Sequence, residues 1–146
     1  MKIAPCNSWE AQSLSHEGHA YVRLKPLWDV TVPRLIACGL DGKEEGFLLA
    51  TRLIANSRHM DPKADAHLLP QLQSSLKAVH EAGVVHGDLR PSNIIVEELH
   101  GLDAGREQRV WIIDFGHAEL DATRKLKDDE MQGLMTLFSS SWAGYR

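Results

Sequence analysis

Cysteine, aromatic residues and long apolar runs are all scarce in this chain. The two cysteines, Cys6 and Cys38, are too few for a disulfide framework and lack zinc-ligand spacing, so we expect free thiols. No run approaches the roughly 20 apolar residues of a membrane-spanning helix, and no basic segment followed by an apolar one opens the sequence. These absences predict an intracellular, cytoplasmic protein with no membrane partner.

An excess of positive charge is also absent. The 16 Lys and Arg against 20 Asp and Glu give a formal net charge of −4, and the basic residues are spread along the chain. This distribution offers no basic face to nucleic acid, so no nucleic-acid partner is predicted. What is present, 43% hydrophobic and 25% charged residues among 146, is the composition of a soluble globular domain with one core.

Apolar periodicity predicts a mixed α+β fold in one unit, because no repeat, low-complexity tract or linker interrupts residues 1–146. Apolar residues recur every three or four positions in the predicted helices, and short apolar runs between turn residues predict strands. The predicted helices span 13–25, 65–82 and 127–140. The predicted strands are 33–39 and 46–51, which form an antiparallel hairpin, and 83–85, 94–96 and 110–113, with the polar stretch 97–109 as a hairpin loop.

Two acidic motifs stand beside these apolar strands. Each motif sits beside an apolar, β-branched run that predicts a buried strand, and loops supported by strands hold their side chains rigidly. The alternative is that Asp88 and Asn93 are turn residues and that Asp114 caps a strand. The two motifs are His86-Gly87-Asp88-Leu89-Arg90-Pro91-Ser92-Asn93 and Asp114-Phe115-Gly116.

The spacing of Asp88, Asn93 and Asp114 resembles the H-x-D-L-x-x-x-N and D-F-G motifs of the protein kinase-like superfamily. The resemblance implies a protein kinase-like fold, with a partial N-lobe and hinge at about 1–55 and a minimal C-lobe at about 56–146. It also implies an ATP-dependent phosphotransferase that uses ATP and Mg²⁺ and transfers the γ-phosphate to a hydroxyl acceptor. Asp88 would be the catalytic base, and Asn93 and Asp114 would hold the metal and the cofactor.

Four more cofactor-binding positions are implied by the same resemblance. The N-terminal M-K-I-A is similar to the end of the V-A-I-K strand motif, whose Lys contacts the ATP phosphates and pairs with a helix Glu. Lys2 and Glu17 would form that pair. Leu53 and Ile54 follow the strand that leads into the hinge, where adenine would bind. The alternatives are solvated positions for Lys2 and Glu17, and a plain strand end for Leu53 and Ile54.

Three positions within the first motif bear on the expected subclass and on the roles of single residues. Arg90 stands where a Lys is often found, and its charge is predicted to stabilise the γ-phosphate during transfer, with a surface ion pair as the alternative. Gly87 replaces the Arg of many protein kinases, and the H-G-D-L form looks like aminoglycoside and choline kinase-like phosphotransferases or small fungal-type kinase-like proteins. His86 is predicted to hydrogen-bond the D-F-G backbone, and the other seven histidines are predicted to lie at the surface.

The kinase pattern is incomplete in this sequence, which contains neither a Gly-rich G-x-G-x-x-G loop nor an A-P-E motif. We therefore expect an N-terminally truncated kinase-like domain whose first strand is a sheet edge. Three interpretations stay open: an active phosphotransferase, a catalytically impaired pseudokinase-like nucleotide-binding or scaffold protein, and a truncated remnant of a longer kinase. Whether the hydroxyl acceptor is a protein or a small molecule also stays open.

Overall fold

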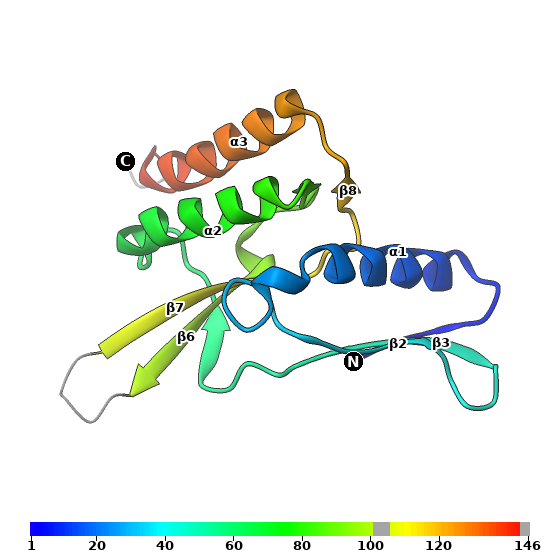
Figure 1. The fold of residues 1–146 in the computed structure, drawn as a ribbon. Coiled ribbons are helices and arrows are strands. Elements are labelled where there is room, and N and C mark those ends of the chain that lie inside the picture. The colour runs from blue at the N-terminus through cyan, green and yellow to red at the C-terminus, as the bar shows by residue number, and fades with distance from the viewer. Residues whose placement is uncertain (101–105, 144–146) are drawn as a thin grey trace.

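The structure, a computed structural model, describes residues 1–100 and 106–143. Figure 1 shows helix α1 lying over one sheet, and helices α2 and α3 stacked beside the strands β6 and β7. Among the described residues, no helix combines the length and the apolar character that crossing a membrane requires. The elements are β1 Lys2–Pro5, α1 Trp9–Arg23, β2 Leu35–Leu40, β3 Gly46–Thr51, β4 Ser57–His59, α2 Leu69–Glu81, β5 Val84–Val85, β6 Ile94–His100, β7 Arg106–Ile112, β8 Glu119–Leu120 and α3 Arg124–Ala143, with 3₁₀ turns at Lys25–Leu27, Ala66–Leu68 and Pro91–Asn93.

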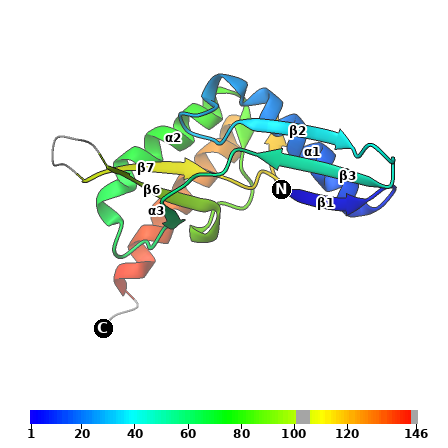
Figure 2. The ribbon, with the colours of Figure 1, turned by 90° about the horizontal axis from the view of Figure 1, so that it is seen from below.

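The first sheet has the strand order β1-β3-β2, and all its neighbours are antiparallel (Figure 2). The predicted hairpin is confirmed as β2 and β3, and β1 pairs along the other side of β3. Strand β1 is therefore an edge, as expected, and its Ile3 points away from α1 and is largely exposed. The opposite face of β1 carries Lys2 and the buried Ala4 toward α1.

Helix α1 begins four residues before the predicted start at residue 13. The side chain of Ser8 accepts a hydrogen bond from the Ala11 N–H at 3.1 Å, which makes Ser8 the N-cap. The helix ends at Arg23 because Pro26 enters a 3₁₀ turn that cannot continue the α-helical hydrogen bonds. The earlier start places the buried Leu14 and Tyr21 on one side of a longer helix.

Helix α2 forms where its apolar stripe predicts it. Leu72, Leu76 and Val79 are fully buried, and Pro70 occupies the first turn, where its missing N–H leaves no helical hydrogen bond unmade. The helix stops before Gly83, whose φ of +86° is a left-handed conformation that favours glycine. Helix α3 is longer than predicted and runs over 124–143.

The second sheet has the order β4-β6-β7, and it corrects the predicted loop at 97–109. Strands β6 and β7 continue through most of that stretch in a regular antiparallel register. Polar residues occupy these strands because cross-strand bonds satisfy them: the Gln108 amide donates to the Glu98 carboxylate at 2.8 Å, and the Trp111 indole donates to Glu97 at 2.8 Å. Residues 101–105 lie outside the described part of the chain.

One hydrophobic core joins the two sheets. Tyr21 of α1 packs edge-on against Phe115, with ring centroids 5.3 Å apart, and the His86 ring lies 4.8 Å from the same phenyl ring. Phe115 therefore joins the second acidic motif to α1 and, through the His86 ring, to the first motif.

Candidate functional site

A pocket of about 310 Å³ opens between the first sheet and the ends of β6 and β7. This volume is within the range of sites for small molecules and cofactors. Most of the cofactor-binding positions predicted from the sequence line it, together with Tyr21, Thr51 and Arg52. The predicted residues in the lining are Lys2, Glu17, Leu53, Ile54 and Asp114.

Lys2 joins two carboxylates at this pocket. Its Nζ lies 2.8 and 3.0 Å from the two carboxylate oxygens of Glu17 and 2.9 Å from Oδ1 of Asp114. Partial burial would by itself lower the pKa of Lys2, but its hydrogen bonds to the two carboxylates outweigh this and raise the pKa above its ordinary value. Lys2 is therefore a cation bound by two carboxylates, and the alternative that it is a free, solvated terminal residue is wrong.

Glu17 is the buried member of this group, with only 2% of its side chain exposed. Its Oε1 also accepts the N–H of Phe115 at 3.2 Å, so one carboxylate contacts β1 and the residue after Asp114. A buried carboxylate requires such partners, because an unpaired charge away from water is costly. The alternative of a solvated helix face is wrong for Glu17.

Asp114 has a φ of +64°, a left-handed conformation that aspartate tolerates better than most residues. Burial alone would raise the pKa of Asp114, but the hydrogen bond and charge of Lys2, with the Gly116 N–H at 3.4 Å, lower the pKa below its usual range. The carboxylate is therefore ionised at neutral pH. It is also partly exposed at the pocket.

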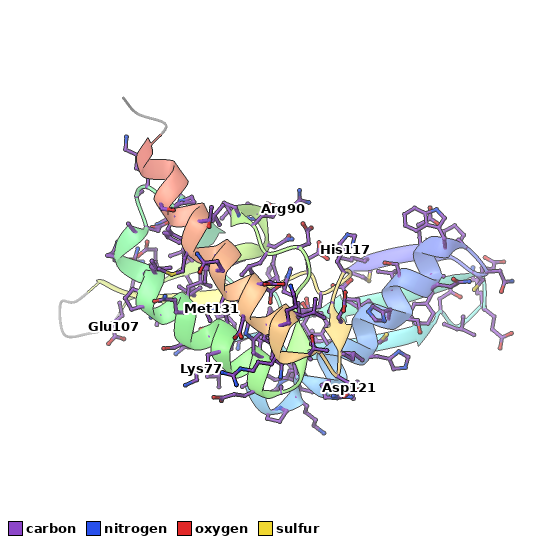
Figure 3. The ribbon with its side chains drawn as sticks, turned by 90° about the horizontal axis from the view of Figure 1, so that it is seen from above. Lys77, Arg90, Glu107, His117, Asp121 and Met131 are labelled. Carbon is purple, nitrogen blue, oxygen red and sulfur yellow. The ribbon has the colours of Figure 1, made fainter. Side chains whose placement is uncertain are left out.

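Asp88, Arg90 and Asn93 form a second cluster beside the pocket. The Asn93 amide donates to the Asp88 backbone oxygen at 2.8 Å and to its Oδ2 at 3.3 Å. The guanidinium of Arg90 lies 3.4 Å from the same Oδ2, and 63% of the Arg90 side chain is exposed. Asn93 therefore holds the loop, while Arg90 extends into solvent (Figure 3).

The two clusters are connected through the backbone, since the Ile113 N–H donates to the backbone oxygen of Asn93 at 3.0 Å. Asn93 and Asp114 thus occupy neighbouring positions at the ends of paired strands. No three His, Cys, Asp or Glu side chains converge as a metal site within residues 1–100 and 106–143. One carboxylate and one amide oxygen still fit Mg²⁺, which commonly takes one or two protein ligands and completes its shell with water and phosphate oxygens.

His86 is fully buried beneath the loop and connects the two motifs. Its Nδ1 accepts the N–H of Asp88 at 3.2 Å, and its Nε2 contacts the Ile113 oxygen at 2.8 Å. These partners assign the tautomer with the proton on Nε2. The predicted contact with the D-F-G backbone therefore falls one residue earlier, at the carbonyl that precedes Asp114.

Glu130 of α3 is a site residue that sequence reasoning missed. Its carboxylate accepts the N–H groups of His86 and Gly87 at 3.1 and 2.8 Å, and it pairs with the His80 ring at 2.8 Å. His80 is buried, so its predicted surface position is wrong. Burial favours a raised pKa for Glu130, but these partners lower it below the ordinary value. No local pattern marks Glu130, because its partners lie 43 to 50 positions away.

Gly87 allows the loop to approach the segment after Asp114. Its φ is +82°, and a Cβ at this position would lie 2.1 Å from the His117 backbone oxygen. Gly87→Ala should therefore destabilise the fold by more than ~1 kcal/mol, because it adds both strain and a backbone clash. Urea denaturation measures this loss. Gly42→Ala is the control, since a Cβ at Gly42 meets nothing within 4 Å, and equal midpoints for the two variants would contradict the close approach.

This geometry consists of a lysine held by a helix glutamate, an aspartate at the end of a neighbouring strand, and a second aspartate on a loop that an asparagine closes. This arrangement is typical of a kinase-like domain. The protein kinase domain family model matches residues 38–138, and the chain belongs to this family. The mixed fold is accordingly a partial kinase fold, as predicted. Lys2 and Glu17 lie outside the matched range.

Curated relatives agree with this assignment. The chain is similar to mitogen-activated protein kinase hog1 of Trichoderma harzianum, HOG1 of Gibberella zeae and hog-1 of Neurospora crassa, at 37% identity over 91 residues in each case. The aligned part covers 61% of this chain and 22% of each relative. The chain therefore spans about a fifth of the length of these relatives. Kinases of this family use ATP with Mg²⁺.

Proposed function

We propose that this domain transfers the γ-phosphate of ATP to a hydroxyl acceptor. The observation that carries the proposal is the position of Lys2, which bonds Glu17 and Asp114 together at the pocket wall. A charged lysine between a buried carboxylate and an exposed one can exchange part of its contact with Asp114 for a phosphate oxygen. Glu17 would keep the ammonium in place during that exchange.

Each remaining site residue has a proposed role. Asp114 and the Asn93 side-chain oxygen would hold Mg²⁺, which supplies charge neutralisation of the phosphates when bound. Asp88 would orient the acceptor hydroxyl and accept its proton, and its neighbour Arg90 has the exposure to reach a phosphate oxygen. Leu53 is largely exposed and Ile54 is buried at the pocket, where they would contact adenine.

For the acceptor, we propose a protein hydroxyl. The relatives are named as protein kinases, whereas the resemblance of the H-G-D-L loop to aminoglycoside and choline kinase-like enzymes favours a small alcohol. The two classes differ in the product that carries labelled phosphate. Labelled ATP offered with a mixed peptide substrate, with choline and with an aminoglycoside separates them, and label on a small alcohol alone would contradict the protein acceptor.

Binding of Mg·ATP is the first test. A ligand that binds only the folded state stabilises it by RT ln(1 + [L]/Kd), which is about 2.7 kcal/mol at a concentration of ~100 Kd. We expect a thermal-shift titration with ATP and Mg²⁺ to raise the unfolding temperature of the wild type, and Asp114→Asn to lose most of that rise. Absence of any rise in the wild type would contradict the proposal.

The same titration separates the alternative function. A pseudokinase-like nucleotide-binding protein would give the full thermal shift without transfer of labelled phosphate to any acceptor or to water.

A further inference from the structure

The stretch from Phe115 to Asp121, which includes β8, runs past α1, and Figure 3 labels His117 and Asp121 along it. Helix α1 contacts it at both ends and in its middle, with side chains from two different turns of the helix. The contacts are the Phe115 N–H to Glu17 at 3.2 Å, the His16 ring to the Ala118 backbone oxygen, and Arg23 to Asp121 at 2.8 Å.

The first half of this stretch is a tight turn. The Ala118 N–H donates to the Phe115 oxygen at 3.1 Å, which closes a four-residue turn directly after Asp114. Two consecutive residues of α1 bind its two ends. Glu17 takes the N–H of Phe115, the first residue of the turn, and His16 takes the C=O of Ala118, the last.

In the His16 contact, the ring must be the hydrogen-bond donor and the Ala118 oxygen the acceptor. A backbone carbonyl only accepts, so Nε2 of His16 must carry the proton. The acceptor belongs to the buried Ala118, whereas the His16 side of the contact is exposed.

The other contacts do not replace this bond. Arg23 and Asp121 have side chains that are 39% and 80% exposed, and such surface ion pairs contribute little. Glu17 is shared with Lys2 and holds only the start of the turn. On the opposite side, the His117 oxygen faces Gly87 of the catalytic loop without a hydrogen bond to it. Within residues 1–100 and 106–143, the side chain of α1 that binds the end of the turn is His16, and the pairing of β8 with β5 holds the residues that follow.

We propose that His16 is a positioning residue: it holds the Phe115–Ala118 turn on α1 and thereby keeps Asp114 within reach of Lys2. The catalytic consequence rests on the proposed phosphotransfer, but the anchoring itself does not. Loss of the bond leaves the far end of the turn held by β8, which pairs with β5, but no longer tied to α1 by His16. The Phe115 N–H then opens more often, and the carboxylate of Asp114 is less well placed for Mg·ATP.

Hydrogen exchange of backbone amides tests the anchoring without any activity. His16→Ala should speed the exchange of the Phe115 and Ala118 amides by about fivefold, the factor expected for one net hydrogen bond. His16→Gln retains a side-chain N–H donor and should restore rates to within about twofold of the wild type. His19→Ala, at an exposed histidine on the same helix, is the matched control and should leave both amides unchanged.

The Mg·ATP dissociation constant of the same variants tests the positioning role. We expect it to rise about fivefold in His16→Ala and to recover in His16→Gln. Unchanged exchange in His16→Ala would overturn the anchoring whatever the affinity shows. Faster exchange with an unchanged dissociation constant would overturn the positioning role. If the wild type binds no Mg·ATP, the proposed function fails, while faster exchange in His16→Ala still establishes the anchored turn.

Discussion

Replacement of Asp88 by Asn should reduce the rate of phosphate transfer by ~10²–10⁴-fold, the usual contribution of a general base. The substitution keeps the size of the side chain, and the Asn93 amide still has the Asp88 backbone oxygen, 2.8 Å away, as its main acceptor. The loop should therefore keep its shape. What is lost is the carboxylate that we propose accepts the hydroxyl proton, so kcat should fall while the Mg·ATP dissociation constant stays the same.

Transfer of labelled phosphate under single-turnover conditions measures this effect directly. Glu107→Gln is the control, because it removes one carboxylate from an exposed position on β7, away from both clusters (Figure 3). Asp114→Asn gives the contrasting result, since it should weaken Mg·ATP binding as well as transfer. Transfer by Asp88→Asn within about twofold of the wild type would contradict the role of Asp88 as the base.

Removal of the Glu130 carboxylate should have the largest effect on stability. Glu130→Ala leaves two N–H groups of the first motif, at His86 and Gly87, without their acceptor and breaks the buried contact with His80. A donor left without its acceptor in the folded protein costs about 1–3 kcal/mol, so the combined loss should be a large share of the 5–15 kcal/mol that holds a typical domain folded. Urea denaturation should show this loss, and Asp129→Ala, next to Glu130 but largely exposed, should show a much smaller one.

The Glu130 carboxylate should also make the free energy of unfolding fall as the pH is lowered. The pKa of Glu130 in the folded state lies below its ordinary value of 4.5, so its contribution to stability is complete above about 4.5. That contribution is lost as the pH falls through the lower folded pKa. We expect the free energy of unfolding of Glu130→Gln to depend less on pH in this acidic window than that of the wild type. Parallel curves for the two proteins would contradict the assignment.

Much of the secondary structure follows from local pattern. The apolar stripe of α2 and the turn residues between β2 and β3 specify their elements because each depends on neighbours in sequence. The predicted loop at 97–109 failed for the opposite reason. Its polar residues are stable in strands only because a partner strand supplies the Gln108–Glu98 bond and its ladder of backbone bonds, and polar composition alone does not reveal a partner.

The same difference between local and long-range contacts applies to the residues of the candidate site. By itself the sequence determined the loop of Asp88 and Asn93, whose hydrogen bonds span five positions, and it identified Asp114 by its motif. Only the tertiary structure decided that Lys2 reaches Asp114 across 112 positions, and that Glu130 binds the loop of the first motif across 43. The physical reason is that short-range spacing is set by backbone geometry, whereas long-range pairing depends on how the core packs α1 and α3 against the loops.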